Sequence, residues 1–304
     1  MRWDDFRRSD NVEDDRGGGG GFGGGGLPMG GGGLGIGTVV VLGIIGWALG
    51  IDPSVLISGA EMVNNTRTQQ SQPYQQPTGR TTRPSDQMGE FVSKVLGNTE
   101  DVWIKVFQDG GQTYRAPRLR LFSGQVQGGC GAATAASGPF YCPTDKRIYL
   151  DTSFFNEMRT RFKGCTGKAC EFAEAYVVAH EVGHHVQNLL GILPKAHQAQ
   201  QAAGNRTAAN RIQVQVELQA DCFAGIWANQ SDQRWKSIEP GDVEAALQTA
   251  AAIGDDRLQK MSRGYVVPDS FTHGSSAQRQ RWFTVGLKAG KVSACNTFAA
   301  NAQL

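Results

Sequence analysis

The chain has 304 residues, enough for one large domain or two ordinary ones. Its formal net charge is +2 and only 19% of its residues are charged, so no strong field favours a nucleic acid or an acidic membrane surface as a partner. Glycine is frequent, with 41 residues, and the excess lies near the N-terminus. We therefore expect a globular domain behind an unusual N-terminal segment, and no nucleic-acid partner.

Residues 1–33 are predicted to be disordered, because a short charged stretch is followed by nearly unbroken glycine at 17–33, which cannot bury a core. Residues 34–51 contain no charged side chain and are long enough to cross a bilayer as one helix. Several arginines precede this segment, and no lysine or arginine follows it until Arg67. The positive-inside rule then places residues 1–33 in the cytoplasm.

The sequence thus predicts a single-pass anchor at 34–51, in the cytoplasmic membrane, with the bulk of the chain on the periplasmic or extracellular side. A cleaved signal peptide ending near Ser58, Gly59 and Ala60 is one alternative, although the region before the apolar stretch is long and partly acidic. A buried helix of a soluble domain is another, but the flanking residues offer nothing to bury it in. Residues 52–87, rich in Gln, Thr and Pro, are predicted to be a disordered linker.

The folded domain is predicted to span residues 88–304. It begins with helical apolar spacing at 88–108, interrupted at Gly97 and Asn98, and an alternating strand at 118–122. The later predictions are strands at 138–142 and 147–151 joined by a turn at 143–146, and helices at 152–162, 173–192, 207–229, 240–260 and 275–289. This order indicates an α+β fold, mainly helical with a small sheet, preceded by one transmembrane helix.

The six cysteines all lie beyond residue 125 and include no Cys-x-x-Cys pair. An even number in a folded domain indicates disulfide bonds in an oxidising compartment. Proximity in the chain favours the pairs Cys130 with Cys142, Cys165 with Cys170, and Cys222 with Cys295. The sequence allows other pairings, and six free thiols in a cytosolic protein are the alternative.

His180, Glu181 and His184 form the pattern His-Glu-x-x-His inside the predicted helix at 173–192. Residues four apart on a helix share a face, so the two imidazoles can bind one metal ion. Glu181 projects from a neighbouring angle, where it can reach a water on that metal. The pattern indicates a zinc hydrolase.

A zinc site that hydrolyses peptides needs a third protein ligand and an open fourth position. Gln187 and Leu190 stand where a metzincin would have Gly and His, so that class is excluded. Glu217 and Asp221 lie four apart on the predicted helix at 207–229. Glu217 can complete the ligand set, and Asp221 can accept the outer N–H of a ligating histidine.

Glu-x-x-x-Asp on a second helix after His-Glu-x-x-His is the gluzincin arrangement. Further motifs are GPFYCPTDKRIYLDTSFF at 138–155, AHEVGHHVQ at 179–187, ELQADCFAG at 217–225 and FTHGSSAQRQRWF at 271–283. Together they resemble the bacterial "putative neutral zinc metallopeptidase" family, mostly single-anchored proteins, over nearly the whole chain. The resemblance implies a zincin-like domain, one zinc ion on His180, His184 and Glu217, and Glu181 as the catalytic base.

An oxyanion formed during hydrolysis needs a donor beyond the zinc. His273 is the first candidate, because related gluzincins place a late histidine near the cleft. Its alternative role is to lead into the last helix, which Ser275 or Ser276 would cap. Tyr149 and Tyr265 are further candidates.

Three other features have open roles. His185 points about 100° round the helix from His184 and is predicted to pack or to support a ligand. His197 is predicted to be exposed. The strand at 147–150 could line the cleft and pair with an extended substrate, or it could be an inner strand.

We therefore expect a membrane-anchored zinc endopeptidase with Glu181 as general base and a protein or peptide as substrate. The competing hypothesis is a non-catalytic binding or scaffold domain stabilised by zinc, whose closed site would need a fourth ligand, with His185 the nearest spare histidine. A hydrolase of non-peptide amides is a third possibility. The pattern predicts neither a side-chain preference nor an oligomeric state.

Overall fold

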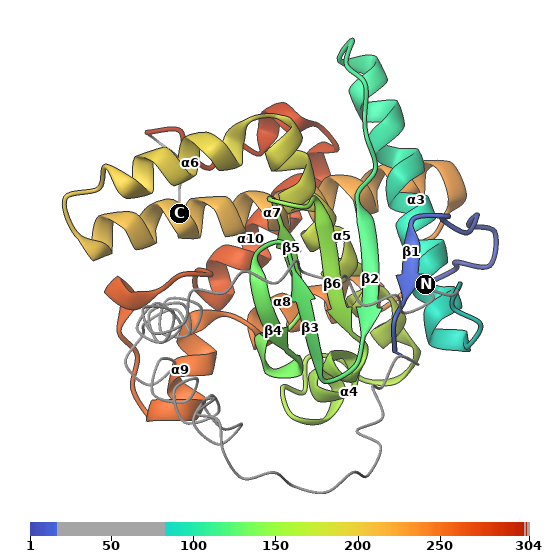
Figure 1. The fold of residues 1–304 in the computed structure, drawn as a ribbon, viewed down its shortest axis with the longest axis horizontal. Coiled ribbons are helices and arrows are strands. Elements are labelled where there is room, and N and C mark those ends of the chain that lie inside the picture. The colour runs from blue at the N-terminus through green and yellow to red at the C-terminus, as the bar shows by residue number, and fades with distance from the viewer. Residues whose placement is uncertain (17–82, 301, 303–304) are drawn as a thin grey trace, which may run out of the picture. The chain divides into compact units, whose positions relative to one another are not determined.

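The computed structural model describes residues 1–16, 83–300 and 302. They belong to one compact unit, Met1–Gly17 with Thr81–Leu304, which is a mainly helical α+β domain. Its strands are β1 Val12–Asp14, β2 Arg118–Phe122, β3 Gln125–Gly128, β4 Gly131–Thr134, β5 Phe140–Cys142 and β6 Arg147–Asp151. Its α-helices are α3 Gln87–Asp109, α4 Ser153–Thr160, α5 Cys170–Leu189, α6 Ile192–Gln201, α7 Arg206–Trp235, α8 Asp242–Ala252, α9 Asp255–Arg263 and α10 Ser276–Ala289 (Figure 1).

The four-stranded sheet has the order β1-β2-β6-β5, with β5 antiparallel to β6 and the other neighbours parallel. Leu119 and Leu121 of β2 pair with Ile148 and Leu150 of β6, and all four side chains are buried in the main core. Alternate residues of a strand point to one face. One face of the sheet therefore packs against the helices.

The opposite face of the sheet carries a smaller apolar cluster. Phe122 of β2 and Tyr149 of β6 are buried there with Val126 and Cys142. Val126 belongs to β3, which forms an antiparallel two-stranded sheet with β4. This hairpin covers the second face, which explains why β6 is buried on both sides.

Helix α5 is the centre of the helical layer, and nearly all of its residues are buried. It contacts α7, and α7 contacts α10 on its other side, while α6 folds back along the first half of α7 (Figure 1). A Cβ at Gly183 of α5 would lie 2.9 Å from the carbonyl oxygen of Ala220 in α7, and a Cβ at Gly286 of α10 would lie 1.9 Å from that of Cys222. Glycine is therefore needed on both neighbours of α7, because the helices touch backbone to backbone.

All six cysteines are paired as proximity predicted. The disulfides join Cys130 to Cys142, Cys165 to Cys170, and Cys222 to Cys295. The first two bridges close short local loops. The third ties the C-terminal segment to α7.

Residues 1–16 are part of the domain, which corrects the prediction that residues 1–33 are disordered. β1 pairs in parallel with β2, and Met1, Phe6 and Val12 are buried in the main core. Further along the segment, the buried carboxylate of Glu100 in α3 accepts hydrogen bonds from Ser9 Oγ at 2.6 Å and from the side chains of Asn11 and Arg7. A short charged segment can order in this way because a partner elsewhere in the chain pairs its charges and its backbone. Residues 17–33 and 52–82 lie outside the described residues.

The predicted transmembrane helix is not supported, and the fold class is corrected in this respect. No helix in the described part of the chain is long and apolar enough to cross a membrane, and residues 34–51 lie outside that part.

Two further element predictions need correction. α3 runs through Gly97 and Asn98 without a break, because Asn98 Oδ1 accepts a hydrogen bond from Trp227 Nε1 at 2.7 Å and Gly97 lies against the N-terminal segment. The helix expected at 240–260 is divided into α8 and α9 at Gly254, where a Cβ would lie 2.5 Å from the nitrogen of Ser276. Of the two roles left open for the strand at 147–150, the structure agrees with the second: β6 is an inner strand, and β5 lies beside it at the edge. β1, the β3–β4 hairpin and α6 were not predicted.

The close contact of Gly97 with the N-terminal segment gives a test of its docking. A Cβ at Gly97 would lie 2.3 Å from the carbonyl oxygen of Arg7. We expect Gly97→Ala to lower the free energy of unfolding by about 1–3 kcal/mol, because this clash outweighs the gain in helix propensity of about 1 kcal/mol. Chemical denaturation measures the change.

Gly110, at the end of the same helix, is the matched control. Its φ is −88°, and a Cβ there would meet nothing closer than 3.5 Å. Gly110→Ala should change stability by less than about 0.5 kcal/mol. Equal stabilities of the Gly97→Ala and Gly110→Ala variants would contradict the docked position of residues 7–9.

Candidate metal centre

His180, His184 and Glu217 are brought together at the contact between α5 and α7. The two imidazole rings, one helical turn apart, have centroids separated by 4.8 Å. Glu217 Oε2 lies 3.3 Å from His180 Nε2 and 3.6 Å from His184 Nε2. One ligand atom from each residue fits within 4.8 Å of the others. This is the group that the sequence predicted, and Glu217 reaches it because Gly183 lets α7 approach α5 closely.

The outer nitrogen of His180 is held by a buried carboxylate. His180 Nδ1 lies 2.8 Å from Asp221 Oδ1, which also accepts a hydrogen bond from the Tyr176 hydroxyl at 2.6 Å. Arg279 of α10 donates two further hydrogen bonds to Asp221, each 2.9 Å long. Asp221 thus occupies the position expected from the sequence, and it is neutralised by a buried arginine.

Tyr176 and Arg279 are two residues around Asp221 that the sequence reasoning missed. Tyr176 precedes His180 by one helical turn, so its position on the same face could have been recognised. Arg279 lies within the quoted motif at 271–283, but nothing local in the sequence connects it with Asp221. That contact exists only because α10 packs across α7.

The second carboxylate of the site is also oriented by an amide. Gln213 Nε2 donates to Glu217 Oε1 at 2.9 Å from one turn earlier on α7. Glu217 Oε1 is therefore occupied, and its Oε2 faces the two histidines. This geometry leaves one carboxylate oxygen for a metal ion.

The charges at the site shift one another's pKa values strongly. Burial acts to raise the pKa of Asp221, but Arg279 and His180 lower it to about 2. Burial acts to lower the pKa of His180, but Asp221 and Glu217 raise it to about 10. A cation that binds to His180 Nε2 therefore competes with a proton for that nitrogen.

Glu181 differs from these carboxylates in having an unsatisfied atom. Its side chain is buried, and its Oε2 has no hydrogen-bond partner among the described residues. Burial raises the pKa of Glu181, although His184 and His180 act to lower it. Two imidazole nitrogens and one carboxylate oxygen are typical ligands of catalytic zinc, which keeps a fourth position open. The residues present therefore fit zinc, with an unpartnered carboxylate beside it.

The loop that carries His273 is fixed by Asp255, the first residue of α9. Asp255 Oδ2 accepts the backbone N–H groups of Thr272, His273 and Gly274 at 2.7, 2.6 and 3.0 Å. The ring nitrogen Nδ1 of His273 lies 3.4 Å from Asp255 Oδ1, and 53% of this side chain is exposed. Ser275 caps α10. The donor role of His273 stays a prediction.

The structure also describes the other candidate residues. Tyr149 donates to Asp145 at 2.6 Å and stacks on Phe140, while Tyr265 is 61% exposed. His185 Nε2 lies 2.6 Å from the carbonyl oxygen of Arg115, and its Nδ1 lies 3.1 Å from the Tyr141 hydroxyl. Both ring nitrogens of His185 are thus occupied away from the metal group. His197 is exposed, as predicted.

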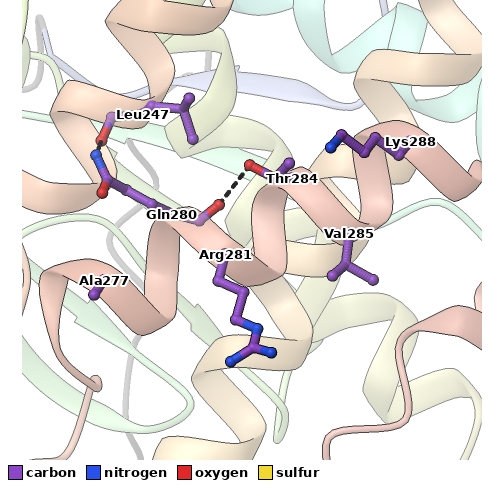
Figure 2. Close-up of a pocket in the computed structure, with 7 residues that line it drawn as sticks. All are labelled: Leu247, Ala277, Gln280, Arg281, Thr284, Val285 and Lys288. Atoms are coloured by element: carbon purple, nitrogen blue, oxygen red, sulfur yellow. Dashed lines mark hydrogen bonds between the residues drawn. The ribbon is translucent and has the colours of Figure 1, made fainter. Parts of the chain in front are cut away.

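A shallow pocket lies elsewhere, between α8 and α10 (Figure 2). Its lining residues are Leu247, Ala277, Gln280, Arg281, Thr284, Val285 and Lys288. They include no imidazole, carboxylate or thiol. Gln280 Nε2 bonds to the carbonyl oxygen of Leu247 at 2.9 Å across this pocket. The pocket is therefore not a metal site.

Comparison with known proteins agrees with the motifs. The family described as "Putative neutral zinc metallopeptidase" matches residues 1–298. "Uncharacterized protein YpfJ" of Escherichia coli strain K12 is 45% identical over 300 residues, 98% of this chain and 99% of that protein. "Uncharacterized protein Mb2605" of Mycobacterium bovis is 44% identical over 262 residues, 83% of this chain and 84% of that protein. No solved structure matches the chain.

The buried, neutral state of His185 predicts a pH dependence of stability. Burial lowers the pKa of His185 from its ordinary value of 6.5 to about 4. Between these values the unfolded chain binds a proton that the folded chain excludes, so stability falls as pH falls through this window, by about 3 kcal/mol at most. Urea unfolding measures this effect. When the pH is lowered from 7.5 to 5, we expect the free energy of unfolding of His185→Gln to fall by about 2 kcal/mol less than that of the wild type.

His197→Gln is the control, because His197 is exposed. Its stability should follow the wild-type pH dependence. A His185→Gln variant with the same dependence would show that this imidazole is not the group that excludes the proton.

Proposed function

We propose that this chain, which belongs to the "Putative neutral zinc metallopeptidase" family, is a zinc-dependent endopeptidase. The observation that carries the proposal is the unpartnered carboxylate oxygen of Glu181 beside the convergent group of His180, His184 and Glu217. A buried carboxylate without a partner costs stability and is retained where a reaction uses it.

Each residue of the site has its own role in hydrolysis. Zinc bound by His180, His184 and Glu217 would supply a Lewis acid that polarises the scissile carbonyl and acidifies water. Glu181 accepts a proton from the attacking water and transfers it to the leaving amine, a role favoured by its burial and its raised pKa. Asp221 keeps the proton of neutral His180 on Nδ1 and so leaves Nε2 free as a ligand.

His273 is the donor that we assign to the developing oxyanion. Three backbone N–H groups bind its loop to Asp255, so the ring is held while its exposed part faces solvent. A Cβ at the next residue, Gly274, would lie 3.0 Å from Leu218 and 3.4 Å from Val214, so the loop packs on the part of α7 that carries Glu217. A partly exposed donor beside the metal can meet a substrate without a large movement.

The geometry favours an enzyme over a zinc-stabilised scaffold. A closed structural site would need a fourth protein ligand, and His185 was the nearest candidate. Its two ring nitrogens face Arg115 and Tyr141 instead. The substrate we propose is a protein or peptide, and cleavage of non-peptide amides only would be a different outcome of the same assays.

We also propose that the domain acts outside the cytoplasm. Its six cysteines form three disulfides, and such bonds persist in oxidising compartments. Residues 1–16 share the compartment of the domain, since they are packed into it.

The catalytic role of Glu181 predicts a separation of hydrolysis from metal binding. Glu181→Gln should lose at least about 100-fold in peptide hydrolysis, because the amide cannot accept the proton, while it keeps one zinc ion per chain. Peptide cleavage and metal analysis of the purified full chain measure the two properties. Glu171→Gln, which changes a carboxylate at the distant start of α5, is the matched control and should remain active.

Two results would contradict the proposed function. Unchanged turnover in Glu181→Gln would exclude this mechanism. Stoichiometric zinc in a wild-type chain that cleaves nothing in a broad peptide library would favour the scaffold. If Glu181→Gln is inactive, peptides that it captures identify the substrate.

The compartment proposal predicts that cells contain the fully oxidised chain. When cells are quenched in acid and treated with a thiol-reactive polymer, none of the six cysteines should react before reduction and all should react after it. Six reactive thiols without prior reduction would place the protein in a reducing compartment.

A further inference from the structure

The outer nitrogen of the second histidine faces a buried glutamine. His184 Nδ1 lies 2.9 Å from Gln187 Oε1, three residues later on α5, where side chains are neighbours on the helix surface. Gln187 is fully buried. A buried amide must satisfy its donors and its acceptor, so its other partners determine how it is oriented.

The orientation of the Gln187 amide follows from its surroundings. Gln187 Nε2 lies 2.7 Å from the carbonyl oxygen of Val216 and 3.0 Å from Gln219 Oε1. Gln219 Nε2 in turn lies 2.8 Å from the carbonyl oxygen of Cys295. Backbone carbonyls only accept hydrogen bonds, so both amide nitrogens must face them. Gln187 therefore presents its oxygen, and not its nitrogen, to His184.

The amide oxygen determines which nitrogen of His184 carries hydrogen. Because Gln187 Oε1 can only accept, the hydrogen bond requires N–H at His184 Nδ1. In the neutral imidazole Nε2 is then without a hydrogen, and its lone pair is free. This nitrogen faces Glu217 Oε2 at 3.6 Å, on the side of the metal group.

We propose that Gln187 is the positioning residue of His184, and that Gln219 holds Gln187 in place. The relay ends at the backbone of Cys295, which the disulfide to Cys222 fixes on α7. The proposal rests on the proposed zinc function, because the free lone pair of Nε2 serves as a metal ligand.

The two histidines are thus supported in different ways. His180 has a carboxylate partner, Asp221, whose charge Arg279 offsets. His184 has a neutral partner, so no further negative charge is added beside Glu181 and Glu217. A neutral acceptor orients His184 without requiring a second buried cation.

Zinc affinity separates this role from simple packing. Gln187→Met keeps the volume but removes the acceptor, and we expect zinc binding to weaken about 10- to 100-fold. Gln187→Glu keeps an oxygen for His184 but loses both donors, and we expect its zinc affinity to stay within about threefold of the wild type, with lower fold stability. If Gln187 only filled space, the apolar Met would be tolerated better than a buried Glu, and the order would reverse.

The measurements use the full chain, with circular dichroism to verify folding. Zinc affinity comes from competition with a chromophoric chelator, and the absorption spectrum of the cobalt-loaded chain reports ligand geometry. Asn98→Leu is the matched control: it removes a buried amide that bonds Trp227 in the core, so it should lower stability and leave zinc affinity unchanged. Gln219→Met, which removes one of the two acceptors that hold the Gln187 amide, should weaken zinc binding by about threefold to tenfold, and it tests the relay if Gln187→Met does not fold.

The outcomes distinguish this inference from the proposed function. A wild-type chain that binds no zinc would overturn both. If the wild-type chain binds zinc, two results would overturn the role of Gln187 alone: equal zinc affinity in Gln187→Met, or weaker zinc affinity in Gln187→Glu than in Gln187→Met. If Gln187→Met does not fold, wild-type zinc affinity in Gln219→Met would overturn that role. An altered cobalt spectrum in Gln187→Met but not in Asn98→Leu supports it.

Discussion

The close approach of α5 and α7 is the constraint on which the site depends. At Gly183 any side chain would meet the carbonyl oxygen of Ala220, so these helices touch through their backbones. This contact brings a carboxylate one turn before Ala220 within 3.6 Å of two imidazoles on α5. The opposite side of α7 is held as closely, since Gly286 of α10 lies against Cys222. α7 is thereby fixed from both sides, and the precision of the metal group follows from the packing of three helices.

Around that group, every candidate ligand is oriented by a second side chain. Asp221 orients His180, Gln187 orients His184 and Gln213 orients Glu217. Burying several carboxylates together would be unfavourable if their charges stayed unpaired, and Arg279 supplies the compensation. The arginine comes from α10, so the helix that fixes α7 in space also balances its charge. Packing and electrostatics at this site therefore depend on the same three elements.

The parts of the site that could be predicted from the sequence are those whose geometry is local. His180 and His184 share a face because one helical turn separates them, and the same rule places Glu217 beside Asp221. Two of the disulfides were predicted because their cysteines are close in the chain. The third pair consists of the two cysteines that then remain. Arg279 and Gln219 could not be found in this way, since their partners lie on other elements. Gln187 was visible only as a residue that excluded another class of enzyme.

The fold shows the same division. The long helices, β2 and β6 were predicted because their patterns extend over several residues, and β5 because a turn joins it to β6. β1 has three residues and gains its structure only from pairing with β2, so no local pattern indicates it. The break expected at Gly97 and Asn98 was wrong because contacts with residue 7 and Trp227 override the weak helix propensity of these residues.

The docking of residues 1–16 also orders events during synthesis. This segment leaves the ribosome before any element that holds it, since Ser9 needs Glu100 and β1 needs β2. Contacts between distant parts of a chain form late, because the intervening loop must first be closed. Until β1 arrives, β2 keeps an open edge that can pair with the same segment of another copy. The interval between making β2 and docking β1 is therefore when neighbouring nascent chains are most able to exchange strands.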